Sequence, residues 1–192
     1  MPNRHEGDDL VTALRRATAA RHRRLDGALA IARAPLTRER YAAFLRGSLR
    51  VLQALEPALS RWPQAYGASL RIECLRADLR SIGAAHDPAP ADVKVPETVA
   101  EAFGAAYVVE GSALGGRVLA PLVQRALGDS APVTYLRLRG DATQAHWQQW
   151  LGRLHAFDEQ ERPGDRDAAC AMACSTFDAY TRALAAATRV AA

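Results

Sequence analysis

The chain has 192 residues, a length that fits one domain with a sizeable core. Abundant alanine and leucine, few isoleucines and valines and only 6% aromatic residues favour helices over strands. The formal net charge of +4 comes from arginines that alternate with acidic residues, without the basic stripe of a nucleic-acid-binding protein. There is also no apolar run of roughly 18 residues and no apolar signal core at the N-terminus. We therefore expect a cytoplasmic protein with neither a nucleic-acid nor a membrane partner.

The first half of the chain predicts three helices. Asp8 or Asp9 caps the first, which ends before Pro35. Its inward stripe follows helical spacing and consists of Leu10, Leu14, Thr18, His22, Leu25 and Leu29. Thr37 caps a second helix that ends at Trp62-Pro63, and a third runs from about 69 to 82.

A proline-containing loop over 83–95 separates these helices from the second half. Pro96 suits the first turn of a fourth helix, which Gly128 ends. Two further helices are predicted at about 143–156 and 165–187. We expect an all-α, single-domain, multi-helix bundle over 1–192, with 1–8 as a flexible N-terminal segment.

Three cysteines, Cys74, Cys170 and Cys174, argue against a disulfide framework in a chain without a secretion signal. Cys170 and Cys174 share a helix face, but the other ligands of a zinc signature are missing. We interpret them as two small buried thiols.

His22 is the first residue that points to chemistry. An imidazole directed into a helical bundle is suited to be an axial ligand of haem iron. Asp26 follows one turn later and can orient the ring. On its own, a core histidine bonded to a neighbour is the commoner explanation, and Asp26 would then be a solvated acid on the helix face.

Glycine is the second such feature. Gly104, Gly111, Gly115 and Gly116 fall in one predicted helix, at a cost of roughly 3–4 kcal/mol relative to alanine. Gly111 and Gly115 share a face and would form a patch of bare backbone. Tight packing between helices is the alternative use of such a patch. Taken with His22, the patch predicts a slot for a flat macrocycle, ligated on one side and open to dioxygen on the other.

Two segments resemble the haem oxygenase family, in the form found in bacterial members associated with bacteriophytochromes. Leu14-Arg-Arg-Ala-Thr-Ala-Ala-Arg-His22-Arg-Arg-Leu-Asp26 is similar to the family's proximal helix. Tyr107-Val-Val-Glu-Gly-Ser-Ala-Leu-Gly-Gly116 is similar to its distal helix. The resemblance implies the haem oxygenase-like fold.

The resemblance also assigns roles. It implies that His22 is the axial ligand of the haem iron, with Asp26 behind it. Haem is then both cofactor and substrate, and Arg15 pairs with a propionate. The resemblance sets these residues over the distal face: Gly111, Ser112, Gly115 and Gly116. We count Tyr107 and Arg117 as further candidates for cofactor binding.

The sequence departs from the family at two of these positions. Many members carry an aspartate where Ser112 stands, and that acid organises distal water. Tyr107 is displaced by one residue from a tyrosine that contacts a propionate in some relatives, so a place in the core is the alternative. Further basic anchors in the C-terminal region could include His146 or Arg153, and the sequence does not choose between them.

The activity implied is the oxidative cleavage of haem to biliverdin, carbon monoxide and ferrous iron. It requires dioxygen and an external electron donor of the ferredoxin or flavin type, and a bacteriophytochrome would be an acceptor for the biliverdin. One alternative is a haem carrier or sensor that kept His22 without turnover. The other is a thiaminase-like enzyme of the same bundle shape, which would use acids and a nucleophilic cysteine.

Overall fold

The structure is a computed structural model that describes residues 9–29, 35–67, 69–84, 88–160 and 162–190. The all-α prediction is confirmed, since these residues form helices and no strand. The prediction for 1–8 lies outside the described residues, as does Asp8. The elements, in chain order, are α1 (Leu10–Leu29), α2 (Arg38–Leu59), α3 (Arg71–Ser81), α4 (Val99–Leu127), η1 (Gly140–Ala142), α5 (Thr143–Asp158) and α6 (Asp165–Val190).

Side-chain caps fix where several helices begin. Asp9 accepts a hydrogen bond of 2.7 Å from the backbone N–H of Thr12 at the start of α1. Thr37 caps α2 as predicted. The fourth helix starts three residues later than predicted, because Thr98 caps it and Pro96 precedes it. Gly128, at φ +97°, ends α4 as expected.

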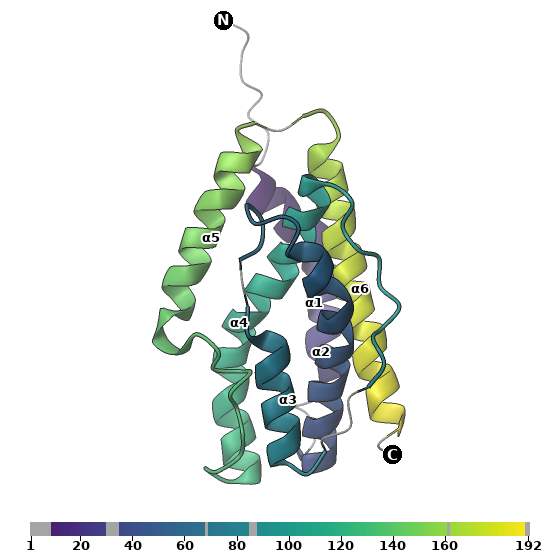
Figure 1. Ribbon diagram of the computed structural model, residues 1–192, viewed down its shortest axis with the longest axis vertical. Helices are drawn as coiled ribbons and strands as arrows, with labels where there is room; N and C mark the ends of the chain where they lie inside the picture. The colour runs from purple at the N-terminus through teal and green to yellow at the C-terminus, as the bar shows by residue number, and fades with distance from the viewer. Residues whose placement is uncertain (1–8, 30–34, 68, 85–87, 161, 191–192) are drawn as a thin grey trace, which may run out of the picture.

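The last helix, α6, packs against α1, α2 and α4 and runs along the side of the bundle away from α5 in Figure 1. Close contact with α4 depends on Gly104, where a Cβ would collide with the backbone carbonyl of Ala169. Helix α3 packs on α2, and α5 lies on one side of the bundle against α4 and α1. None of the described helices combines the length and apolarity that a bilayer span requires.

The inward stripe of α1 changes character along the helix. Leu10, Leu14 and Thr18 are buried, whereas Leu25 is half-buried and His22 is exposed. The side chain of Leu29 lies outside the part of the chain that is described. The first half of α1 is therefore core, and its second half borders open space.

The three cysteines are free and half-buried, so Cys170 and Cys174 are less buried than predicted. The Sγ of Cys174 donates to the Ala17 carbonyl oxygen at 3.4 Å, and burial raises the pKa of the Cys170 thiol. Both cysteines therefore belong to the contact between α6 and α1.

Candidate functional site

A cavity of about 480 Å³ lies between α1 and α4. Its size is within the range of small-molecule sites, and most of its surface is apolar. Helices α2 and α6, the segment between α4 and η1, Arg71 of α3 and Trp147 of α5 complete its walls. The cavity brings together most of the predicted site residues, namely Arg15, His22, Asp26, Tyr107, Gly111, Ser112, Gly115 and Gly116.

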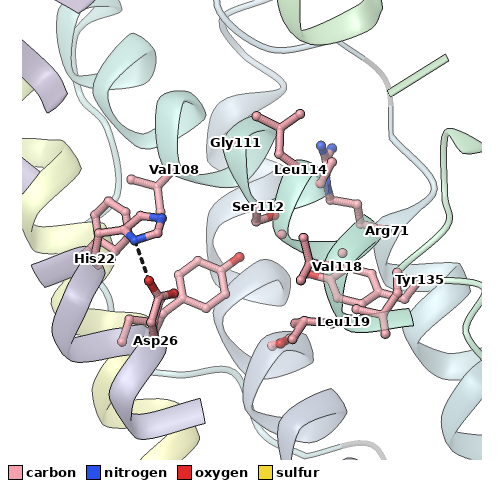
Figure 2. A pocket seen from close by; sticks show the side chains of 18 of the residues that line it. His22, Asp26, Arg71, Val108, Gly111, Ser112, Leu114, Val118, Leu119 and Tyr135 are labelled. Atoms are coloured by element: carbon pink, nitrogen blue, oxygen red, sulfur yellow. Dashed lines mark ion pairs between the residues drawn. The ribbon is translucent and has the colours of Figure 1, made fainter. Parts of the chain in front are cut away.

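His22 and Asp26 form one side of the cavity (Figure 2). The Nδ1 of His22 lies 2.8 Å from a carboxylate oxygen of Asp26, and the imidazole meets the ring of Phe177 edge-on at 5.6 Å between centroids. A carboxylate at Nδ1 favours the tautomer in which Nδ1 carries the proton. Nε2 then holds a lone pair, and among the described residues none forms a hydrogen bond with this nitrogen. The side chain is 62% exposed because it borders the cavity, so the simple core-histidine alternative does not hold.

The opposite side belongs to α4, where Gly111, Ser112 and Leu114 face His22 across the cavity (Figure 2). A Cβ at Gly115 would have no described atom within 4 Å, and one at Gly111 would meet only the Trp147 ring at 3.7 Å. Gly116 differs, because a Cβ there would lie 2.5 Å from the Leu136 carbonyl oxygen. Gly111 and Gly115 therefore leave space in the cavity, whereas Gly116 permits close packing of the chain behind it.

Arg15 and Tyr107 form a polar corner of the cavity. Tyr107 packs its ring against Trp147 and Trp150, so it is also part of the core as the alternative held. Burial raises the pKa of the Tyr107 hydroxyl, while Arg15 and the Thr18 hydroxyl beside it oppose that rise. Arg15 is exposed, so it offers a cation and hydrogen-bond donors at this edge.

A polar inner wall completes the cavity, and sequence reasoning missed most of it. Its members are Ser48, Arg71, Ser112, Tyr135 and Tyr180. Burial raises the pKa of the Tyr135 hydroxyl, against the opposing effects of Arg71 and of the hydroxyls of Ser112 and Ser48. The Tyr180 hydroxyl is buried and has no hydrogen-bond partner among the described residues. These groups could hold water or a polar atom of a ligand.

Behind this wall lies a buried ion pair. Arg71 donates from Nη2 to Glu110 Oε2 at 2.8 Å, and both side chains are at most 2% exposed. Arg71 also donates to the hydroxyls of Tyr66 and Ser69. Burial alone would raise the pKa of Glu110, but Arg71, together with Arg139 and His146, outweighs it, so that pKa is lowered. One signal for this pair was present in the sequence, since Glu110 interrupts an apolar stretch of helix.

Three other candidates lie away from the cavity. Arg117 is exposed and does not line it, so the structure does not support its prediction as a haem contact. His146 pairs through Nε2 with Glu110 Oε2 at 3.0 Å, on the far side of Arg71. Arg153, on the same helix, does not line the cavity either.

The sequence is similar to that of a curated bacterial protein. Over 122 residues, the chain is 33% identical to a protein of Xanthomonas campestris pv. campestris (strain 8004) named "Heme oxygenase". The matched region covers 59% of this chain and 71% of that relative. No family model matches the sequence. At this identity and coverage, and with a histidine facing a glycine-lined helix across a cavity, the chain belongs to the haem oxygenase family.

Proposed function

We propose that this protein is a haem oxygenase that cleaves haem to biliverdin, carbon monoxide and ferrous iron. The observation that carries the proposal is the arrangement of the cavity. Nε2 of His22 is free on one side, and the Gly111–Gly115 backbone leaves space on the other. Haem is the substrate, and its iron is where dioxygen and the donor's electrons meet.

The residues present fit a porphyrin. A neutral imidazole whose Nδ1 is held by a carboxylate is the usual form of a haem-ligating histidine. The apolar walls suit the ring, and Arg15 with Tyr107 offers donors to an anionic propionate. Arg71 also lines the cavity, but Glu110 balances its charge. Among the residues that line the cavity, Arg15 is therefore the better propionate anchor.

The inner wall supplies what the glycine helix lacks. Ser112 stands where many relatives carry an acid, and its hydroxyl donates to the Val109 carbonyl oxygen of its own helix at 2.7 Å. The hydroxyls of Tyr135 and Tyr180 lie at the same end of the cavity, next to the Arg71 guanidinium. We propose that they order the water beside the haem by donating hydrogen bonds to that water, since both phenols stay protonated. A ferredoxin- or flavin-type donor and a bacteriophytochrome acceptor are proposed on the sequence resemblance alone.

The test is turnover by the purified protein with haem, a reductant and air, followed by biliverdin absorbance and carbon monoxide release. We expect the wild type to form bilin and His22→Ala to lose both turnover and the ferric haem spectrum of a histidine ligand. His155→Ala is the matched control, because His155 is also exposed but lies 3.9 Å from Asp9, outside the cavity. An unchanged axial-ligand spectrum in His22→Ala would refute the assignment.

A haem carrier or sensor is the second candidate, and the absence of an acid at Ser112 favours it. In that case the wild type binds haem through His22, but the reduced complex persists in air. Gly115→Leu sharpens the distinction, since it should keep haem binding and stop bilin formation. A bilin yield equal to that of the wild type would contradict the distal role of this helix. The thiaminase-like alternative loses support because none of the three cysteines lines the cavity.

A further inference from the structure

A second pocket opens on α5, on the other side of the Arg71–Glu110 ion pair from the haem cavity. It is lined by Leu138, Arg139, Ala142, Ala145, His146 and Gln149. The polar groups facing it come from Arg139, just before η1, and from His146 and Gln149 on α5. Nothing in the proposed haem chemistry uses these residues.

One buried oxygen serves three cationic or basic groups here. Glu110 Oε2 lies 2.8 Å from Arg71, 3.0 Å from His146 Nε2 and 3.6 Å from Arg139. Arg71 is closest and fully buried, so it takes most of the Glu110 charge. The 3.6 Å contact of Arg139 is too long for a hydrogen bond. Arg139 and Arg71 therefore share the single negative charge of Glu110, and the cluster keeps a net positive charge.

The hydrogen-bond donors of Arg139 are also incompletely used. Its side chain is 22% exposed, and its buried Nε has no partner among the described residues. Burial lowers the pKa of Arg139 and Glu110 opposes that change, while the guanidiniums of Arg71 and Arg153 lower the pKa further. Asp141 lies in η1 but does not line the pocket. The pocket therefore presents a guanidinium that an anion would stabilise.

His146 adds a selective feature. Burial lowers the pKa of its imidazole, with Glu110 opposing, so the neutral ring is favoured near pH 7. The carboxylate at Nε2 fixes the proton on that nitrogen, and Nδ1 is then a hydrogen-bond acceptor. An oxyanion that carries a hydroxyl can donate to Nδ1 while accepting from Arg139 and the Gln149 amide. A fully deprotonated oxyanion cannot.

We propose that this pocket is a binding site for inorganic phosphate, in the hydrogen phosphate form that retains a proton at pH 7.5. Sulfate has the same shape and, at pH 7.5, the same charge as hydrogen phosphate, but no proton. A hydrogen bond to a charged group contributes about 1.5–3 kcal/mol, so phosphate should bind at least about tenfold more tightly than sulfate.

Calorimetric titration of the full chain without haem tests the site directly. Inorganic phosphate, glycerol 3-phosphate, sulfate and acetate are titrated separately at pH 7.5 and constant ionic strength. We expect saturable phosphate binding that Arg139→Gln weakens at least about tenfold. Arg137→Gln is the matched control, since Arg137 is exposed, pairs with Gln124 and does not line the pocket. Glycerol 3-phosphate has lost its second phosphate proton at this pH, since the second pKa of a monoester is about 6, so it should bind no more tightly than sulfate. Binding of glycerol 3-phosphate that is tighter than that of phosphate would overturn the proposal.

Two variants separate the proposal from a loss of folding. Gln149→Ala removes an exposed amide from the rim and should weaken phosphate binding without touching Glu110. His146→Phe should remove the preference for phosphate over sulfate while leaving weak binding of both. Equal affinity for phosphate, sulfate and acetate in the wild type would overturn the proposal. So would an undiminished phosphate affinity in Arg139→Gln. Neither result depends on whether the protein cleaves haem.

Discussion

Helix α4 uses glycine in two opposite ways, and the contrast runs along a single element. At Gly104 and Gly116 the missing side chain lets another backbone approach, from Ala169 and from Leu136. At Gly111 and Gly115 it leaves room in the cavity. The intrinsic cost to the helix is the same at each position, about 1 kcal/mol relative to alanine. Only the neighbours from distant parts of the chain decide which glycines build the fold and which shape the site.

The charged residues divide in the same way. His22 and Asp26 are four residues apart on one helix and border the cavity. Arg71 and Glu110 are 39 residues apart on two helices and are buried behind it. The first pair can change at little structural cost, whereas the second joins α3 to α4 through a buried ion pair. Variants in the two groups should therefore separate effects on folding from effects on the ligand.

The largest effect is expected from Glu110→Leu. Removal of one partner leaves the Arg71 charge buried and unbalanced, at a cost of about 3–5 kcal/mol in the free energy of unfolding. Urea denaturation measures this loss. The double variant Arg71→Met/Glu110→Leu should recover most of it, because no buried charge is then left unpaired. If the double variant is as unstable as the single one, the loss in the free energy of unfolding comes from changed side-chain packing rather than from an unpaired charge.

The same pair predicts a pH dependence. The pKa of Glu110 is lowered from its ordinary 4.5, so its contribution to stability is complete above that pH. It is lost as the pH falls below about 4.5 and passes through the lowered pKa. The difference in stability between the wild type and Glu110→Leu should therefore shrink on acidification. A difference that stays constant down to pH 3 would contradict this linkage.

Gly104→Ala should have the next largest effect on stability. A Cβ at this position collides with backbone rather than with a flexible side chain, so α4 and α6 must move apart. Such overpacking costs about 1–3 kcal/mol, more than the gain in helix propensity returns. Urea denaturation again provides the measurement. A variant as stable as the wild type would mean that the two helices separate easily.

The fold was largely predictable because each helix signals its limits locally. Thr37 caps the start of α2 and Gly128 ends α4, both where the sequence places them. The spacing of apolar residues identifies the face of each helix that packs in the core. The start of α4 was misplaced because Pro96 is compatible with a first turn, while Thr98 makes the actual capping bond.

The site was predictable only where its parts share a helix or a motif. His22 with Asp26, and Gly111 with Gly115, were found through spacing and resemblance. The inner wall was not, because Tyr135 and Tyr180 reach the cavity from a loop and from α6. No local pattern distinguishes such tyrosines from ordinary core residues. Arg117 shows the opposite case, since it follows Gly116 in the chain but does not line the cavity.

Asp26→Asn should have a smaller effect, confined to the ligand. The amide keeps the shape of the side chain but weakens the hydrogen bond that orients the imidazole and raises its basicity. Haem affinity should fall about tenfold, and the free energy of unfolding should change little, because the pair is more than half exposed. Spectrophotometric haem titration measures the affinity.

Asp178→Asn is the control for Asp26→Asn. Asp178 accepts a 3.0 Å hydrogen bond from Arg21 of α1, so its loss breaks a comparable ion pair close to His22 in sequence. Asp178 does not line the cavity, and haem affinity should stay at the wild-type value. Equal losses of affinity in both variants would indicate a general disturbance of α1 rather than a specific effect on the imidazole.

The smallest effect, and the one of opposite sign, is expected from Gly115→Ala. The added methyl group meets no described atom within 4 Å, so the gain in helix propensity is not offset by a collision. The free energy of unfolding of the protein without haem should rise by up to about 1 kcal/mol. Gly152→Ala on α5, where a Cβ also has open space, should give a similar rise.

A loss of stability at Gly115 alone would mean that this part of α4 packs against another segment, and its role as an open wall would fail. Matching gains at Gly115 and Gly152, against a loss at Gly104, would show that glycine at the cavity is kept at the expense of stability, as expected where a ligand needs the space.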